Sequence, residues 1–144
     1  MSEIKKREKV AIIGCADSKK LAPFDRPNDW EFWGVNNLYI TLKAQWTRWF
    51  EIHAIDYNQS MDRYFRRGKP DFRGLPINEY LAQLQSLGIP VYMQKAWPII
   101  PNAVIYPIQQ VLAKFGNYFT NTVSYMIALA MLEGFKTIGI WGVD

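Results

Sequence analysis

Val10-Ala11-Ile12-Ile13-Gly14 is a short, uninterrupted apolar run that ends at a glycine. Such a run favours a strand covered on both faces, because a strand with one face in water alternates apolar and polar residues. Four later stretches are similarly rich in apolar and aromatic residues: 31–35, 48–52, 89–93 and 137–141. β-Branched and aromatic side chains suit a pleated surface. We therefore expect a parallel sheet of about five strands.

Helical patterns lie between these predicted strands. Apolar residues spaced three or four apart run from Ile77 to Leu87, and Gly88 follows as a stop. A second pattern begins near Val123 and ends at Gly134. We expect a third, more polar helix over residues 56–67 and an irregular, proline-containing stretch over residues 92–107. The alternation predicts an α/β fold of three layers, with helices on both faces of the sheet.

Length and composition limit the class of protein. The chain has 144 residues, of which 49% are apolar and six are Trp, which suits one domain with a real core and excludes disorder or a disulfide scaffold. A single cysteine cannot form an internal bridge and predicts a reducing compartment, the cytoplasm. The longest apolar run, residues 125–132, is far shorter than the roughly 20 residues of a membrane helix. Neither a membrane span nor a signal peptide is expected.

The net charge of +4 comes from one segment. Residues 63–73 carry five cations against Asp71, and the rest of the chain is neutral, with twelve basic and twelve acidic residues. General nucleic-acid binding is therefore not favoured. Interleaved aromatic residues leave two interpretations open: a solvated helix end, or a surface that binds an anion, a nucleic acid or an acidic partner. The cations of that surface are Arg63, Arg66, Arg67, Lys69 and Arg73.

Polar and small residues follow several of the predicted strands. Ligands of open parallel sheets bind at the carboxyl ends of the strands, so these residues are the candidates for a nucleotide site. The second predicted long helix opens with hydroxyl and amide side chains, and a helix start can hold an anion. The candidate nucleotide-binding residues are Gly14, Cys15, Ser18, Asn36, Thr120, Asn121, Thr122 and Gly142. Each has a plainer alternative: a strand-exit turn, an ordinary turn or a helix cap.

Catalytic groups are scarce in this sequence. His53 and Asp144 are the candidates for a general base, although a lone histidine after a strand is more often structural. One cysteine and one histidine do not make a zinc site, and no metal is expected. A hydrolase built on Cys15 and His53 remains a third hypothesis, because a cysteine beside basic groups can become nucleophilic.

Most of the chain resembles a known group of proteins, and the resemblance is most specific in the last 25 residues. Phe119-Thr120-Asn121-Thr122-Val123-Ser124, the glycine-ended helix and Trp141-Gly142-Val143-Asp144 are similar to segments of Rossmann-like nucleotide-binding transferases. This group includes the family 42 sialyltransferases and the motility-associated glycosyltransferase-like and pterin pyrophosphokinase-like proteins. Val35-Asn36-Asn37-Leu38-Tyr39 looks like the family's asparagine segment after the second strand. Small phage-encoded proteins also look like this, which would place the chain in the host cytoplasm.

The resemblance implies a function and exposes two departures. It implies a nucleotide surrounded by Gly14, Ser18, Asn36, Thr120 and Thr122, with His53 at the family's third-strand position near it. The family's first loop reads Gly-x-Gly-Pro-Ser, whereas Gly14-Cys15-Ala16-Asp17-Ser18 lacks the second glycine and the proline. The sialyltransferases also place their catalytic histidine after the Gly-x-Asp strand, where this sequence stops. Residues 1–144 are thus either a minimal domain or part of a longer one.

Two hypotheses follow. The first is a single Rossmann-like domain that binds a nucleotide or a nucleotide-sugar, with glycosyl or diphosphate transfer as the reaction if it is an enzyme. The second is a non-enzymatic interaction module that uses residues 63–73. No cofactor other than a nucleotide-type ligand is expected, and the sequence leaves the oligomeric state open.

Overall fold

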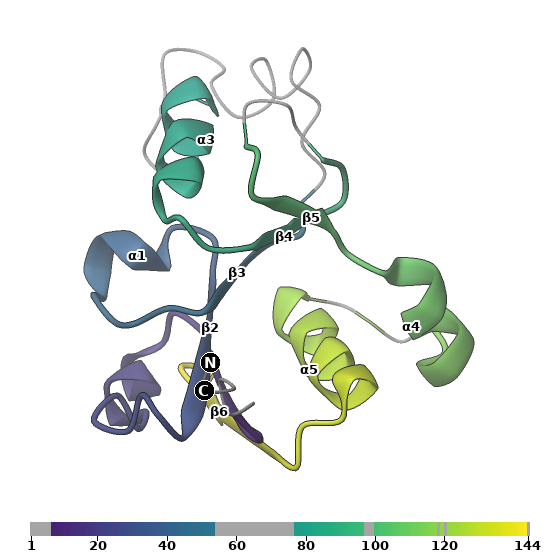
Figure 1. The fold of residues 1–144 in the computed structure, drawn as a ribbon, viewed down its shortest axis with the longest axis horizontal. Coiled ribbons are helices and arrows are strands. Elements are labelled where there is room, and N and C mark those ends of the chain that lie inside the picture. The colour runs from purple at the N-terminus through teal and green to yellow at the C-terminus, as the bar shows by residue number, and fades with distance from the viewer. Residues whose placement is uncertain (1–6, 54–76, 97–99, 118, 120, 144) are drawn as a thin grey trace, which may run out of the picture. The chain divides into compact units, whose positions relative to one another are not determined.

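The computed structural model describes residues 7–53, 77–96, 100–117, 119 and 121–143. Their elements, in chain order, are β1 (Lys9–Ile13), η1 (Asp17–Leu21), β2 (Trp30–Val35), α1 (Leu38–Thr41), β3 (Arg48–Glu51), α3 (Ile77–Ser86), β4 (Val91–Met93), β5 (Ala103–Ile105), α4 (Ile108–Phe115), α5 (Thr122–Glu133) and β6 (Thr137–Trp141) (Figure 1). They fall into two compact units, Met1–Phe50 with Pro107–Asp144, and Glu51–Tyr106. That the chain forms a single domain stays a prediction.

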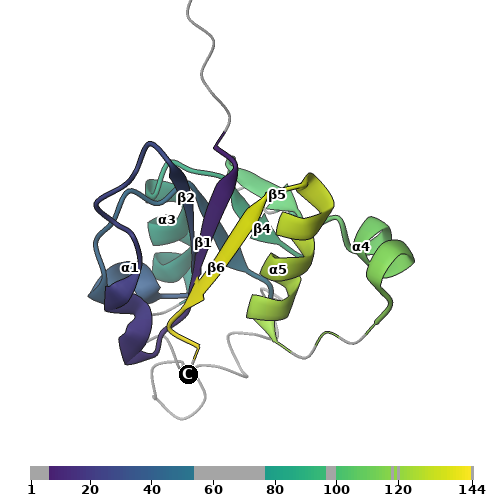
Figure 2. The ribbon, with the colours of Figure 1, turned by 90° about the horizontal axis from the view of Figure 1, so that it is seen from below.

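The first unit is built on a parallel sheet in the order β3-β2-β1-β6. Ile12 of β1 lies opposite Trp33 of β2 and Ile140 of β6. Figure 2 shows β1 and β6 side by side, running in the same direction. Residues Val10 to Ile13 are fully buried, as the apolar run predicted. The expected parallel α/β fold is confirmed.

Helices cover both faces of this sheet. α1 and α5 lie on opposite sides of β2 in Figure 1. On the α5 side, the Trp33 ring packs against the rings of Phe50 and Phe135, with centroids 5.1 and 5.5 Å away. On the α1 side, Trp49 packs against Tyr39 at 5.7 Å. Trp33 and Trp49 are thus fully buried at the centre of aromatic clusters on the two faces of the sheet.

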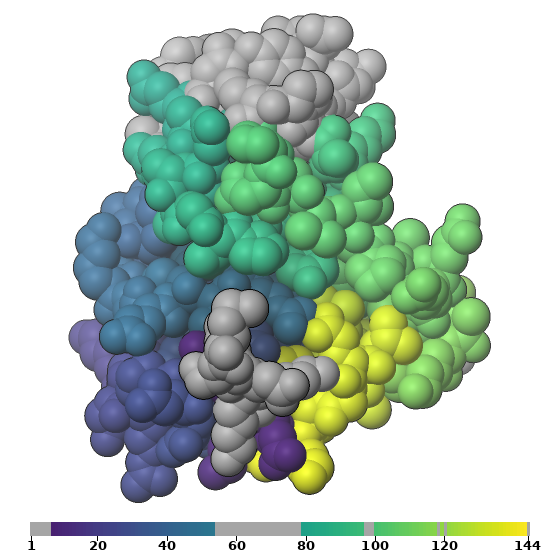
Figure 3. All heavy atoms as spheres, viewed as in Figure 1, coloured from purple at the N-terminus to yellow at the C-terminus, as the bar shows by residue number. Residues whose placement is uncertain are grey.

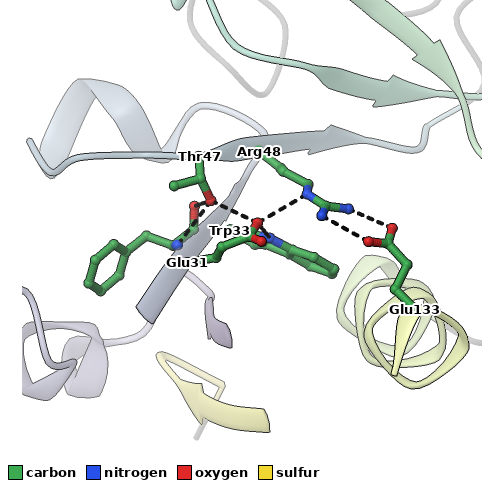
Figure 4. Close-up of polar contacts among 6 residues, drawn as sticks. Glu31, Trp33, Thr47, Arg48 and Glu133 are labelled. Atoms are coloured by element: carbon green, nitrogen blue, oxygen red, sulfur yellow. Dashed lines mark hydrogen bonds and ion pairs between the residues drawn. The ribbon is translucent and has the colours of Figure 1, made fainter. Parts of the chain in front are cut away.

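Arg48 joins the amino end of β3 to the last turn of α5 (Figure 4). Its guanidinium donates two hydrogen bonds to the Glu133 carboxylate, at 2.6 and 2.8 Å, and its Nε donates to Glu31 Oε1 at 3.1 Å. The guanidinium also lies 4.7 Å from the centroid of the Trp33 ring. A cation at a helix C-terminus is additionally favoured by the helix dipole. This network holds β2, β3 and α5 together at the amino ends of the strands.

The second unit contains α3, β4 and β5. β4 and β5 are parallel, with Val91 opposite Ala103 and Met93 opposite Ile105. α3 buries Tyr80, Leu81 and Leu84, members of the predicted apolar stripe.

The structure corrects some sequence expectations. The stretch expected to be irregular contains β5, so the described residues hold six strands and not five. α1 and α4 were not predicted, and the helix expected over residues 56–67 lies outside the described residues.

In the space-filling view the surfaces of α4 and α5 lie side by side (Figure 3). Within the described ranges, every helix is too short or too polar to cross a lipid bilayer.

Candidate functional site

The carboxyl ends of β1 and β6 meet at the point where the strand order reverses. β2 and β3 follow β1 on one side of the sheet, and β6 lies on the other. Ligands of open α/β sheets bind outside such a point. Gly14 and Gly142 stand there so close that a Cβ on either would lie 2.4 Å from the carbonyl oxygen of the other. The sequence-predicted glycines are therefore together, and packing alone requires both of them.

The loop after β1 is tied to β6 by hydrogen bonds. The Gly14 N–H donates to the Trp141 oxygen at 2.8 Å, and the Ala16 N–H donates to the Gly142 oxygen at 2.9 Å. The Gly142 N–H donates to Ser18 Oγ at 2.8 Å. These N–H groups already have partners within the chain, so a phosphate near this loop would need other donors. Cys15 lies in the same loop and is exposed.

Asn36 follows β2 in an unusual conformation. Its φ of 52° lies in the left-handed region, which asparagine tolerates better than most residues. Its backbone is fixed there, because its N–H donates to the Phe50 oxygen at 3.0 Å and its oxygen accepts from Trp49 Nε1 at 2.8 Å. Asn36 Oδ1 is buried without a hydrogen-bond partner. Such strain and such an unpaired group are typical of binding sites.

The start of α5 is a capping box. Asn121 is the N-cap, and its Oδ1 accepts a hydrogen bond from the Ser124 N–H at 2.9 Å. Ser124 Oγ in turn lies 3.4 Å from the Asn121 N–H. Asn121 thus has the plainer role that the sequence left open. Thr122 is the first helical residue and is half-buried, and the N–H groups of Thr122 and Val123 have no partner inside the helix.

His53 belongs to a polar cluster in the second unit. Its Nδ1 lies 3.1 Å from Glu51 Oε1, and the Tyr80 hydroxyl donates to Glu51 Oε2 at 3.0 Å. Glu51 is 1% exposed, whereas the His53 side chain is 40% exposed. Gln94 Nε2 donates to the Ile52 oxygen at 2.7 Å and so holds the backbone between Glu51 and His53. A buried carboxylate thus orients a histidine that solvent reaches.

Sequence reasoning missed Glu51 and Tyr80 as site residues. The signal was a glutamate inside an apolar strand, two residues before the only histidine of the sequence. Residues two apart on a strand lie on the same face, so this spacing could have indicated that Glu51 and His53 are neighbours. Tyr80 carries no comparable signal, because it reads as one more apolar position of α3.

Several predicted site residues lie outside the described part of the chain. They are Thr120, Asp144, Arg63, Arg66, Arg67, Lys69 and Arg73. Their proposed roles, and the hydrolase hypothesis on Cys15 and His53, stay predictions. In the ranges that are described, no three histidine, cysteine or acidic side chains gather as a metal site requires.

No protein-family model and no curated protein matches the sequence. Solved structures do match in fold. The sialyltransferase CstII from Campylobacter jejuni, in complex with the substrate analogue CMP-3FNeuAc, aligns with 94% of this chain and 64% of its own, at 19% identity and a TM-score of 0.58. The fold is that of these sialyltransferases. An α-2,3-sialyltransferase from the same organism, in apo form, aligns with 96% of this chain and 60% of its own, at 18% identity and a TM-score of 0.54.

These matches confirm the expected likeness in fold. The chain spans less than two thirds of the length of these sialyltransferases. The resemblance to pterin pyrophosphokinase-like proteins and to phage proteins stays a prediction.

Proposed function

We propose that this chain binds a nucleotide or nucleotide-sugar at the carboxyl ends of β1 and β2 and acts in group transfer from it. The observation that carries the proposal is Asn36, with its left-handed backbone and its buried, unpaired Oδ1. Leaving a buried acceptor unpaired costs about 1–3 kcal/mol, and a bound ligand can supply the missing donor. Support comes from the fold, which CstII uses in complexes with CMP.

Asn36 suits the base or the ribose of such a ligand. Its Oδ1 accepts a hydrogen bond from an exocyclic amino group or a ribose hydroxyl, and its amide nitrogen can donate to a ring nitrogen or a carbonyl. Because the backbone of Asn36 is fixed on both sides, the amide is positioned before the ligand arrives. Such preorganisation lowers the entropy lost on binding.

The start of α5 suits the phosphate. The first-turn N–H groups of Thr122 and Val123 and the Thr122 hydroxyl are donors at the positive end of the helix dipole. Figure 2 shows the start of α5 at the same end of the first unit as the ends of β1 and β6. Donors placed there would stabilise the charge that develops on a leaving phosphate, which is the main catalytic term in such transfers.

Calorimetry with CMP, UDP, ADP and GDP tests the proposal. We expect heat with at least one of them, with CMP the first to try. Asn36→Ala should weaken that binding at least tenfold, since a lost hydrogen bond to a buried group is worth about 1.5 kcal/mol or more. Asn37→Ala is the matched control, because Asn37 is the neighbouring amide with an ordinary φ of −99° and no capping bond from its side chain.

The control should bind within about twofold of the wild type, a difference smaller than one ordinary hydrogen bond. Absence of heat with all four nucleotides, from protein shown to be folded, would count against the proposal. Equal losses in the two variants would show that Asn36 has no special role.

A further inference from the structure

We propose that Trp49 is a positioning residue for the amide side chain of Asn36. The Trp49 indole Nε1–H donates a hydrogen bond to the Asn36 backbone oxygen at 2.8 Å, and the Asn36 N–H donates to the Phe50 oxygen at 3.0 Å. These bonds fix the two peptide planes that flank Asn36, and the orientation of those planes sets its φ and ψ. The Trp49 bond thereby holds the left-handed backbone, with its φ of 52°, from which the amide projects. The inference rests on the proposed function only for what the amide binds.

The Trp49 ring is confined, so its N–H points in one direction. Trp49 is 0% exposed, so its N–H cannot exchange the Asn36 oxygen for water. Gly34 lies opposite Trp49 in the register of β2 and β3, and a Cβ on Gly34 would overlap the six-membered ring of Trp49. The rings of Tyr39 and Trp46 pack edge-to-face with the Trp49 ring, with centroids 5.7 and 5.0 Å away. The Trp49 ring therefore occupies the space that the missing side chain of Gly34 leaves.

The left-handed backbone of Asn36 depends on such a bond. This conformation is disfavoured for every residue with a Cβ, and asparagine tolerates it better than most. An extended backbone at position 36 would turn the carbonyl away from Trp49 and leave a buried indole donor unpaired. That loss is worth at least about fivefold in the conformational equilibrium, so the bond keeps Asn36 in place before a ligand arrives. Without it, part of the population would have to be reordered on binding, and the affinity would fall.

NMR of the free protein tests the positioning without any ligand. A positive φ brings a residue's own amide and α protons close together, so wild-type Asn36 should show a strong NOE between them. Trp49→Phe keeps an aromatic ring but removes the donor, and we expect this NOE to weaken. Trp33→Phe is the matched control, because Trp33 is equally buried and donates its indole hydrogen bond to Glu31 Oε1 at 2.9 Å. The control should leave the NOE of Asn36 unchanged.

Calorimetry with the nucleotide that binds the wild type measures the consequence for affinity. Trp49→Phe should weaken binding about five- to tenfold, whereas Trp33→Phe should stay within about twofold of the wild type. In an Asn36→Ala background, Trp49→Phe should weaken binding no further, because a residue that acts through another has no effect once the other is removed. A residue that only stabilised the fold would weaken binding equally in both backgrounds.

An NOE of Asn36 that is as strong in Trp49→Phe as in the wild type would overturn the proposal. So would equal losses of affinity in Trp49→Phe and Trp33→Phe, or an undiminished effect of Trp49→Phe in the Asn36→Ala background. Should Trp49→Phe fail to fold, replacing Trp49 with 3-benzothienylalanine keeps the shape of the indole and removes only its N–H donor. If no nucleotide binds the wild type, the proposed function fails, while the NOE still decides whether Trp49 holds Asn36.

Discussion

The two ends of the sheet in the first unit differ in how their polar groups are paired. At the amino ends of the strands, the Arg48 guanidinium has two carboxylate partners and an aromatic face. At the carboxyl ends, Asn36 has a left-handed backbone and a buried side-chain oxygen without a partner. Gly14 and Gly142 lie so close there that neither has room for a Cβ. The charges of the Arg48 network are paired, although Trp46 Nε1, just before β3, is buried without a partner. Asn36 differs in combining its unpaired oxygen with a left-handed backbone. Backbone strain together with an unpaired buried group is common at functional sites, so the carboxyl ends are where we propose that the ligand binds, whereas the Arg48 network is expected to stabilise the fold.

The largest effect is expected at Arg48. Arg48→Met should lower the free energy of unfolding by about 3–5 kcal/mol, because it leaves the carboxylates of Glu31 and Glu133 without their shared cation in a mostly buried place. Urea denaturation measures this. Arg48→Lys is the control and should lose less, since one ammonium keeps the charge but not the two-pronged bond to Glu133. A loss below about 1 kcal/mol in Arg48→Met would show that the network stabilises the protein no more than an ordinary surface ion pair does.

The glycine contact at the other end should be the next most sensitive feature. Gly142→Ala should cost about 2–4 kcal/mol, because it combines a left-handed φ of 77° with a Cβ placed 2.4 Å from the Gly14 oxygen. Gly134→Ala isolates the first of these effects, since Gly134 has a φ of 84° and nothing within 4 Å of an added Cβ. It should cost about 1 kcal/mol. Equal losses in thermal or urea unfolding would show that the close approach at Gly14 is relieved at no cost.

Much of the fold could be predicted from the sequence because its strongest signals are local. β1, β2, β3, β4 and β6 coincide with apolar runs, and α3 and α5 with periodic stretches ended by glycine. β5 has only three residues, two of them exposed, and it lies in a stretch with several prolines. A strand this short gives no clear signal in the sequence. α1 is a single turn, too short for a period to show. α4 has apolar residues at 108, 111, 112 and 115, a helical spacing from which this helix could have been predicted.

The candidate site was only partly predictable. The residues after each strand followed from the topology of parallel sheets, and Asn36 and His53 were named on that basis. Chemical type alone could not separate a ligand-binding amide from a capping amide. Asn36 and Asn121 look alike in sequence, yet one has an unpaired oxygen and the other a capping bond. The Tyr80 contact with Glu51 joins residues 29 positions apart, a distance over which sequence spacing carries no signal.

Asn121 tests whether the carboxyl end contains structural residues as well. Asn121→Ala should lower stability by about 1 kcal/mol, the usual cost of a lost N-cap, with the loss read from thermal unfolding. Asn121→Asp keeps an accepting oxygen and should restore the stability. If Asn121 is only a cap, nucleotide affinity should fall in Asn121→Ala, where the start of α5 is destabilised, and stay at the wild-type value in Asn121→Asp. A loss of affinity in Asn121→Asp at full stability would instead make Asn121 a ligand-binding residue and extend the site along α5.

The smallest change in stability, and the sharpest test of the comparison, is expected at Asn36. Asn36→Gly removes both the left-handed strain and the unpaired oxygen, so the free energy of unfolding should stay equal or rise by up to about 1 kcal/mol. The same variant should lose the nucleotide affinity that Asn36→Ala loses. Urea unfolding and calorimetry on one preparation measure both quantities. A stability loss above about 1 kcal/mol would make Asn36 structural like Arg48 and remove the contrast between the two ends. A gain in stability together with lost affinity is the trade-off expected where a residue is kept for a ligand.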